Sequence, residues 1–294
     1  MGKFLHSLRL KRNAREAASA QDRAQATFSH RAMLLPLALA QFLASYDTSS
    51  MNVAMSRITE DLGTTVTGVQ TAITVFTLTM AALMIPGSKL TDIWGRKRCF
   101  VLGVSIYGLG ALITATAPVL AVMMIGFSVL EGIGSALMIP PIYILITISF
   151  TDSIARTKAF ALVSAAGGLG SASGPLIGGL ITTTISWRAS FLGEVFVVLL
   201  ILYLSRRILS AGVEGRKPEF DLIGAALSAA GLTSTVIGIL QAGMYGWLRA
   251  RKDFAIGDEV ILRKGDISPV VLFMAIVLTS MPNNAQQPGL APAA

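Results

Sequence analysis

The sequence is poor in charged residues and in cysteine. Only 14% of its 294 residues are charged and 53% are apolar, whereas a soluble domain has roughly a quarter of charged residues. The single cysteine, Cys99, excludes a disulfide bond within the chain. No Gly-rich phosphate loop, zinc-ligand spacing or Ser/His/Asp arrangement is evident, so we expect neither an enzyme nor a bound cofactor. Lipid rather than water is the expected solvent.

What the chain does have is a series of long apolar runs. A membrane helix needs about 20 mostly apolar residues to cross about 30 Å of hydrocarbon. Seven runs reach that length and an eighth is shorter; they lie at about 33–54, 69–88, 99–117, 119–146, 159–183, 188–205, 221–243 and 269–281. The predicted fold class is an all-α polytopic membrane protein, with a six-helix bundle followed by about two further transmembrane helices.

The polar segments divide the chain and orient it. We predict a cytoplasmic basic tail at 1–31, a six-helix transmembrane bundle at 32–205, a cytoplasmic loop at 206–220, two extra helices within 221–281 around a loop at 244–268, and a disordered tail at 282–294. Lys and Arg concentrate in the first tail and in the loops after the second, fourth and sixth runs. The loops after the first, third and fifth runs contain only Arg57 and Arg188. This asymmetry predicts a multi-pass protein of the inner or plasma membrane with a cytoplasmic N-terminus, and it explains the net charge of +8 without nucleic acid.

Three acids interrupt the apolar runs of the bundle: Asp47, Glu131 and Glu194. A charge inside the membrane is costly, so each is a candidate functional residue that faces the bundle interior. A rise of about 1.5 Å per residue puts Glu131 near the midplane and the other two in the outer half. Because desolvation disfavours the charged form of a carboxyl group, each could exchange protons near neutral pH. The alternative is a structural role, with each acid neutral or hydrogen-bonded to nearby Ser, Thr or Tyr side chains.

A short basic segment, Gly87–Arg98, joins the second and third runs. It predicts a tight turn of a helical hairpin, and its notable residues are Gly87, Asp92, Gly95, Arg96 and Lys97. An acid among cations opposes the topology signal, so we expect Asp92 to pair with Arg96 or with a helix N-terminus. The alternative is a plain basic turn without a further role.

The fifth run carries a series of small residues and a proline. These are Gly170, Gly174, Pro175, Gly178 and Gly179. Glycines four residues apart let another backbone approach one helix face, and proline breaks the hydrogen-bond ladder and kinks the helix. The pattern predicts a close-packed hinge, and the alternative is a packing face alone.

Together these segments resemble the major facilitator superfamily, and in particular its fourteen-span drug:proton antiporter-like branch. Gly87–Arg98 is similar to the cytoplasmic gating motif G-x-x-x-x-D-x-x-G-R-K-R, and the fifth run is similar to the antiporter hinge motif. Residues 46–54 resemble the branch's L-D-x-T-x-x-N-V-A motif, and the segment Trp187–Phe191 resembles its W-R-x-x-F motif.

One motif departs from the family pattern. The family's R-x-x-Q-G-x-G in the fourth span stands here as Ser128-Val-Leu-Glu131-Gly-Ile-Gly. The arginine that the family uses in proton transfer is replaced by Ser128, and an acid has appeared where the glutamine would be. Any proton relay must therefore be arranged differently.

The resemblance implies a secondary transporter that exports drug-like or amphiphilic small molecules by proton-coupled alternating access. Its energy source would be the proton gradient, with no other cofactor, and its partners would be the lipid bilayer, the substrate and protons. The family builds its substrate path between two six-helix bundles, whereas this sequence supplies the first bundle and two linker-like helices, so we expect a truncated chain. The alternative is a transport-inactive fragment, or a half-transporter that needs a second half or a homodimer.

Overall fold

The computed structural model describes residues 33–206 without a break and short stretches beyond them. The latter are residues 224, 227, 229–231, 233–234, 254–256, 259–262, 267–268 and 271. The predicted tails at 1–31 and 282–294 lie outside the described residues, as do most of the loop at 206–220 and most of the two extra helices.

Long helices account for nearly all of the described chain, because a backbone in lipid must satisfy its polar groups internally. The first helix is continuous through the described residues 33–61. The later elements are α2 (Val66–Trp94), α3 (Arg96–Ala115), α4 (Leu120–Met123), the π-helix η1 (Met124–Glu131), α5 (Gly132–Ser149), α6 (Ser153–Ser173), the π-helix η2 (Gly174–Gly178), α7 (Gly179–Thr184) and α8 (Trp187–Ser205). Five stretches in the described part are long and apolar enough to cross a membrane: α2, α3, α4–η1–α5, α6–η2–α7 and α8. The predicted fold class is therefore confirmed.

Besides the turns between helices, the described residues include a small β-hairpin. Strand β1 (Phe254–Ile256) pairs antiparallel with β2 (Glu259–Leu262). Both strands fall within the segment 244–268, for which the sequence predicted only a loop.

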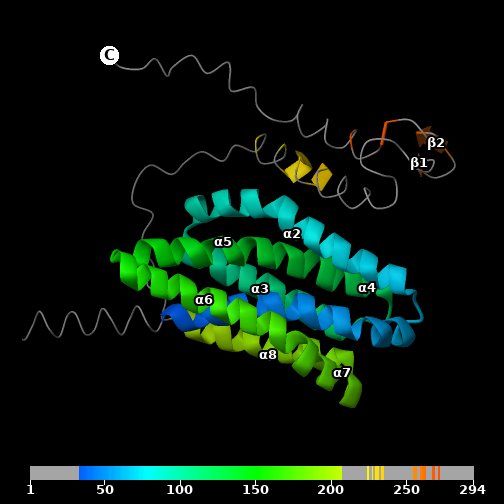
Figure 1. Cartoon of the computed structure of the whole chain (residues 1–294), viewed down its shortest axis with the longest axis horizontal. Helices are drawn as coiled ribbons and strands as arrows, with labels where there is room; N and C mark the ends of the chain where they lie inside the picture. The colour runs from blue at the N-terminus through cyan, green and yellow to red at the C-terminus, as the bar shows by residue number, and fades with distance from the viewer. Residues whose placement is uncertain are drawn as a thin grey trace, which may run out of the picture.

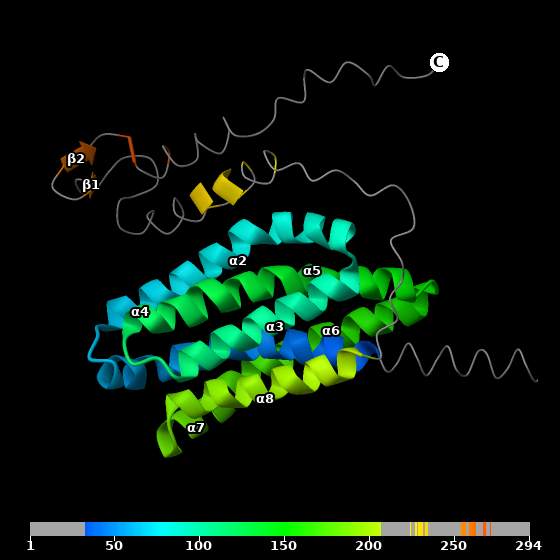
Figure 2. The same ribbon diagram turned by 180° about the vertical axis from the view of Figure 1, so that it is seen from behind.

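The first helix and the five long helical segments lie side by side in an elongated bundle (Figures 1 and 2). Helices α2 and α8 are on opposite sides of it in both views. The central helix α3 packs against α5, η1 and α8. We call the two ends of the bundle the Gly95 end, where α2 meets α3, and the Trp187 end, where α8 begins.

The tight turn that the sequence predicted within Gly87–Arg98 is confined to Gly95, and the rest of the segment is helical. Helix α2 continues to Trp94, and α3 begins at Arg96, so Gly95 alone separates them. Gly95 has a φ of 95°, which a residue without a Cβ atom adopts readily. The chain reverses at this single residue, and the charged residues on either side extend the helices beyond the apolar runs.

The core of the bundle consists of two apolar clusters, one toward each end. The cluster at the Gly95 end includes Leu43, Phe100, Tyr107, Met138, Ile142, Val198 and Ile201. The cluster at the Trp187 end includes Met51, Ile58, Ala111, Met123, Phe127, Trp187 and Phe191. The site described next lies between them.

Candidate functional site

Three buried carboxyl groups meet inside the bundle. Asp47 comes from the first helix, Glu131 from the end of η1 and Glu194 from α8. One carboxylate oxygen of each lies within 4.8 Å of those of the other two. The three residues, which we call the carboxyl cluster, are 0%, 0% and 2% exposed. The sequence singled out all three but expected Glu131 to lie deeper than the others, whereas the structure brings them together.

The carboxyl cluster forms a polar layer between the two apolar clusters. On the first helix, Asp47 lies between Leu43, which belongs to the Gly95-end cluster, and Met51, which belongs to the Trp187-end cluster. On α8, the same change occurs between Val198 and Phe191. The acids therefore sit at the inner boundary of both cores and not at either end of the bundle.

Helix α3 supplies the hydrogen-bond donors of this layer. The Tyr107 hydroxyl donates to Glu194 Oε2 at 2.9 Å, and the Thr114 hydroxyl lies 3.1 Å from Glu131 Oε1. The two donors are seven residues apart, so they share one face of α3. Sequence reasoning missed both residues, although two polar side chains at that spacing in an apolar helix were a usable signal.

Three of the other oxygen atoms of the carboxyl cluster have no donor. Both oxygens of Asp47 and Oε2 of Glu131 are buried without a hydrogen-bond partner. Neither ion pair found among the described residues involves the cluster. Three like charges in one buried site repel one another and lose their hydration. That cost falls when the carboxyl groups share protons or when a cation binds among them.

Close helix packing places Glu131 beside α3. A methyl group on Gly110 would lie 2.7 Å from Glu131 Cγ and 2.7 Å from the Gly126 carbonyl oxygen. Without side chains at these glycines, α3 and η1 approach backbone to backbone. Glu131 is also the last residue of a π-helical segment, a wider turn that occurs often at functional sites.

The antiporter hinge motif packs on both sides of Asp47. A methyl group on Gly170 would collide with the Phe42 carbonyl oxygen of the first helix, and one on Gly178 would collide with Ser50 Oγ. A methyl group on Gly174 would collide with Ser49 in the same way, and one on Gly179 would lie 3.2 Å from Val53 Cγ1.

Pro175 does not end the helix of the hinge motif. It lies within η2, and the chain stays helical from Ser153 to Thr184. The wider π turn accommodates the ring, which cannot donate to the hydrogen-bond ladder. The predicted close packing against another helix is thus present, with the first helix as the neighbour.

The gating-motif residues lie at the Gly95 end and are not brought to the carboxyl cluster. From Arg96, α3 rises about 16 Å, at about 1.5 Å per residue, before it reaches Tyr107. Gly87 is buried where α2 meets α5, because a methyl group there would lie 2.7 Å from the Ala136 carbonyl oxygen. This end is a second, separate feature of the bundle.

The predicted ion pair of Asp92 with Arg96 is not found among the described residues, and the alternative, an interaction with a helix N-terminus, stays a prediction. Asp92 is exposed, and no ion pair among the described residues includes it or Arg96. Water solvates an exposed carboxylate well, so a surface pair gains little. Lys97 instead reaches across to α8, where its Nζ donates to the Arg206 carbonyl oxygen at 3.4 Å.

Ser128, which stands in place of the family's arginine, has a structural contact. Its hydroxyl donates to the Ala72 carbonyl oxygen of α2 at 2.7 Å, and the residue is fully buried. This bond joins η1 to α2.

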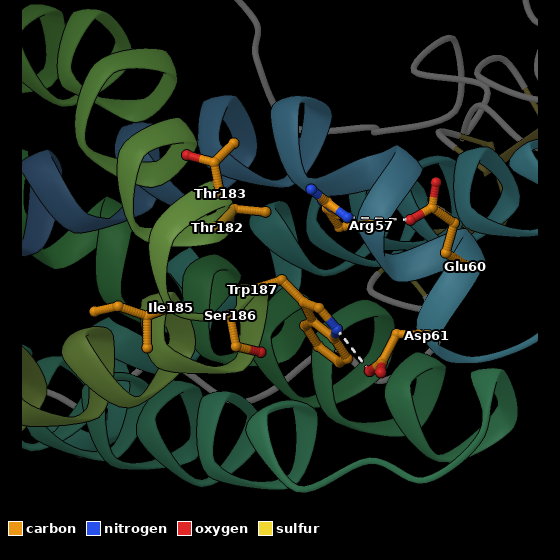
Figure 3. A pocket seen from close by; sticks show the side chains of 8 residues that line it. All are labelled: Arg57, Glu60, Asp61, Thr182, Thr183, Ile185, Ser186 and Trp187. Atoms are coloured by element: carbon orange, nitrogen blue, oxygen red, sulfur yellow. Dashed lines mark hydrogen bonds and ion pairs between the residues drawn. The ribbon is translucent and has the colours of Figure 1, made fainter.

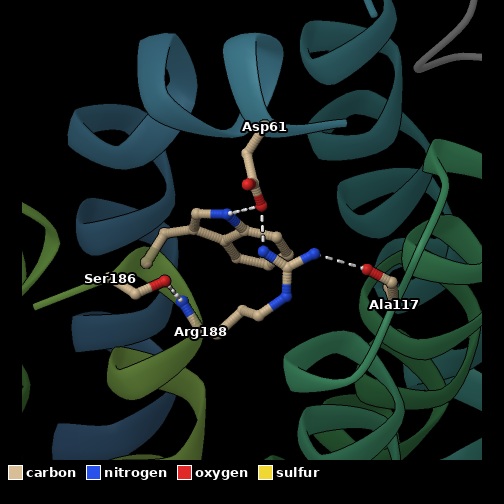
Figure 4. Close-up of polar contacts among 5 residues, drawn as sticks. Asp61, Ala117, Ser186 and Arg188 are labelled. Carbon is tan, nitrogen blue, oxygen red and sulfur yellow. Dashed lines mark hydrogen bonds and ion pairs between the residues drawn. The ribbon is translucent and has the colours of Figure 1, made fainter. Parts of the chain in front are cut away.

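A polar contact that the sequence did not predict joins three helices at the Trp187 end (Figure 4). Arg188 forms an ion pair with Asp61 at the end of the first helix, and it donates to the Ala117 carbonyl oxygen after α3 at 2.8 Å. Trp187 Nε1 also donates to Asp61, at 2.9 Å, and the Arg188 guanidinium lies 4.4 Å from the Trp187 ring centroid. The W-R pair therefore anchors the start of α8.

A pocket opens beside this contact (Figure 3). Its volume is about 390 Å³, and its lining residues are Arg57, Glu60, Asp61, Thr182, Thr183, Ile185, Ser186 and Trp187. In Figure 3 the side chains of Thr182 and Arg57 extend toward each other from α7 and the first helix.

Comparison with known proteins gives a family match and several relatives. The family described as Major Facilitator Superfamily matches residues 37–285. The cephamycin export protein of Amycolatopsis lactamdurans is 34% identical over 235 residues, which are 78% of this chain and 48% of that protein. The puromycin resistance protein of Streptomyces alboniger is 30% identical over 88% of this chain and 49% of its own length. The methylenomycin A resistance protein of Bacillus subtilis is 31% identical over 73% of this chain and 46% of its own length.

The chain thus spans about half the length of the curated relatives that it matches. Among solved structures, a peptide transporter in complex with sulfate superposes with a TM-score of 0.58 and 15% sequence identity. That match covers 76% of this chain and 53% of the other. At this identity the likeness shows the fold alone.

Proposed function

Because the chain belongs to the major facilitator superfamily, we propose that it serves proton-coupled export of drug-like or amphiphilic small molecules by alternating access. The family is one of transporters, and the chain is a multi-pass integral membrane protein. The relatives named above are an export protein and two resistance proteins, which supports an outward direction of transport. The proton gradient is the proposed energy source.

The carboxyl cluster is the observation that carries this proposal. Three acids from three helices share one buried site that holds no paired cation among the described residues. Binding protons lowers the electrostatic cost of burying three carboxylates, and so does binding a cationic or amphiphilic solute in exchange for those protons. A relative movement of the helices that carry the acids would change the repulsion between them, which couples proton binding to conformation.

Asp47 is the proposed exchange group within the cluster. Glu194 and Glu131 each have a hydroxyl neighbour from α3, whereas both oxygens of Asp47 lack a donor. The hinge motif contacts the first helix at Phe42, before Asp47, and at Ser50, after it, so movement of the α6–η2–α7 segment would move the helix that carries Asp47.

The orientation proposed from the sequence has a cytoplasmic N-terminus in the inner or plasma membrane. The positively charged Gly95 end then faces the cytoplasm, and the Trp187 end faces the opposite side. Alternating access needs a wall opposite this bundle. A second half-protein or a second copy of the chain would supply it.

A transport-inactive fragment is the second candidate. The observation in its favour is that the chain spans about half the length of its relatives. In that case the carboxyl cluster would bind protons without transport.

Everted membrane vesicles that contain the full chain test the proposal. Ethidium serves as an amphiphilic cationic probe, and a pH-sensitive dye reports proton movement when ethidium is added. We expect ethidium to drive proton movement, and we expect Asp47→Asn to reduce it to the level of vesicles without the chain. The matched control is Asp152→Asn, because Asp152 caps α6 outside the cluster and asparagine caps a helix equally well.

The result separates the two candidates. Movement in the wild-type chain that is lost in Asp47→Asn and kept in Asp152→Asn supports coupled transport. No probe-driven proton movement in the wild-type chain contradicts it and favours the inactive fragment.

A further inference from the structure

Three buried hydroxyl groups in the Trp187 half of the bundle are not bonded to their own helices. Ser and Thr side chains in helices commonly donate to the carbonyl oxygen four residues earlier, as Thr59 and Ser205 do here. Ser50, Ser190 and Thr182 are 4%, 3% and 6% exposed, yet none of them makes such a bond. Their hydroxyl groups are available to other partners.

Two of these hydroxyl groups link the first helix to α8. Ser50 Oγ lies 3.1 Å from Ser190 Oγ, and the Tyr46 hydroxyl lies 2.8 Å from the same Ser190 atom. Ser50 is three residues beyond Asp47, and Ser190 is four residues before Glu194. Since both steps lead toward the Trp187 end, this pair lies about one helical turn, about 5 Å, from the carboxyl cluster.

Thr182, the third hydroxyl group, lies between the Ser50–Ser190 pair and the pocket. Gly178 of the hinge motif touches Ser50, since a methyl group there would collide with Ser50 Oγ. Thr182 lies one turn further along the same rod and lines the open pocket at the Trp187 end (Figure 3). Its Oγ1 is buried behind the pocket wall without a hydrogen-bond partner, so a small opening of that wall would let a water molecule from the pocket bind it.

We propose that this pocket is the entrance of a hydrated proton route that runs through Thr182 and the Ser50–Ser190 pair to the carboxyl cluster. Hydroxyl groups occur at each helical turn between the pocket and the acids. They lie within the apolar cluster of the Trp187 end, whose members include Met51, Ala54 and Phe191. Steps of about one turn are too long for direct hydrogen bonds, so single waters bridge them. Each hydroxyl group accepts a proton on one side and donates one on the other, so none carries lasting charge.

The use of the route rests on the proposed proton coupling, but its existence does not. Cysteine labelling tests the existence alone. The only cysteine, Cys99, is buried and is replaced by alanine to give a background without thiols. Thr182→Cys and Ser190→Cys are then made in the full chain, and Ala115→Cys is the control, because Ala115 is 3% exposed and lies in the apolar cluster of the same end.

The probe is a small, positively charged, membrane-impermeant methanethiosulfonate, added to everted and to right-side-out vesicles. Because a thiol reacts only where the reagent can reach it, we expect Thr182→Cys, which lines the pocket, to react about an order of magnitude faster than Ala115→Cys, and from one side of the membrane only. Ser190→Cys should react more slowly than Thr182→Cys, because the reagent is larger than the single waters of the route. Rates equal to that of Ala115→Cys would overturn the proposal. Equal reaction from both sides would do the same.

A second measurement tests the role in proton transfer. Infrared absorption of protonated carboxyl groups follows proton uptake by the cluster after a pH jump, and Glu194→Gln identifies the band. We expect the double variant Ser190→Ala/Thr182→Val to take up the same number of protons several-fold more slowly. An unchanged rate overturns the route and leaves the proposed function intact, whereas no band that responds to pH in the wild-type chain contradicts the proposed function itself.

Discussion

At the scale of single residues, the carboxyl cluster depends on the side chains that α3 presents to it. Tyr107 is fully buried and donates to Glu194, which is itself 2% exposed. A buried carboxyl oxygen that loses its donor cannot turn to water instead. The donor therefore fixes the position of Glu194 relative to the other two acids.

Replacing Tyr107 by phenylalanine tests this role. We expect Tyr107→Phe to lower the free energy of unfolding by about 1–3 kcal/mol, because a buried acceptor is left unsatisfied. Thermal unfolding of the purified chain in detergent measures the change. The control Tyr143→Phe removes a hydroxyl group from an exposed residue whose bond to Gln41 is long, 3.5 Å, and should have little effect. Equal shifts for the two variants would contradict the assigned role.

At the scale of elements, small residues decide how closely the rods approach. The α6–η2–α7 rod contacts the first helix through the glycines of the hinge motif, and α3 contacts η1 through Gly110 and Gly126. Both contacts position residues of the carboxyl cluster. The π-helical segments η1 and η2 occur in these same two rods.

Two glycines of the same helix allow a matched comparison. Gly170→Ala would push the rod away from the Phe42 carbonyl oxygen, so we expect a loss of about 1–3 kcal/mol from overpacking. Gly168→Ala meets nothing within 4 Å, and there alanine should stabilise the helix by about 0.5–1 kcal/mol. Thermal unfolding compares the two, and a similar effect at both positions would contradict the packing described.

The sequence could predict the helices and the candidate residues on them, but not that the three acids lie together. Charge inside an apolar run identified Asp47, Glu131 and Glu194, and glycine spacing identified the hinge motif, because both signals are local. The convergence of the acids depends on helix rotation and on the π-helical segment η1, which shifts the register of Glu131 by an amount that hydropathy does not encode. Helix ends were underestimated for a related reason: Asp152 caps α6 seven residues before its apolar run begins at about 159, so polar residues belong to the helix too.

At the scale of the whole molecule, one polar contact joins three helices at the Trp187 end, while much of the apolar surface of the outer helices is not covered by other helices. Arg188 connects the first helix, the end of α3 and α8 through Asp61 and Ala117. Of the apolar window of α2, only 17% is buried, compared with 56% for α3. The bundle is thus internally tied at one end and offers broad apolar faces to lipid or to a second bundle.

Removing the tie should loosen the whole bundle. We expect Arg188→Leu to cost about 1–2 kcal/mol, a value kept low because both partners are partly exposed and screened by water. Arg57→Leu is the matched control, since the Arg57–Glu60 pair is more exposed and lies within one helix. Thermal unfolding measures both, and the interpretation is wrong if Arg57→Leu costs as much.

Transport by vesicles that contain only this chain requires a second copy as the opposing wall. Cys99 is buried and cannot report an interface, so a cysteine is introduced at Ile85 of α2, which is 44% exposed. In a Cys99→Ala background we expect Ile85→Cys to cross-link as a dimer in vesicles that transport ethidium. Ethidium transport by a chain that stays monomeric would contradict this requirement.

The most direct test of the central claim counts the protons that the purified full chain releases when ethidium binds, with a pH indicator in weakly buffered solution. We predict proton release in the wild-type chain and in Asp152→Asn. We predict none in the triple variant Asp47→Asn/Glu131→Gln/Glu194→Gln, provided that it still binds ethidium. Equal proton release from the triple variant would show that the carboxyl cluster does not carry the exchanged protons.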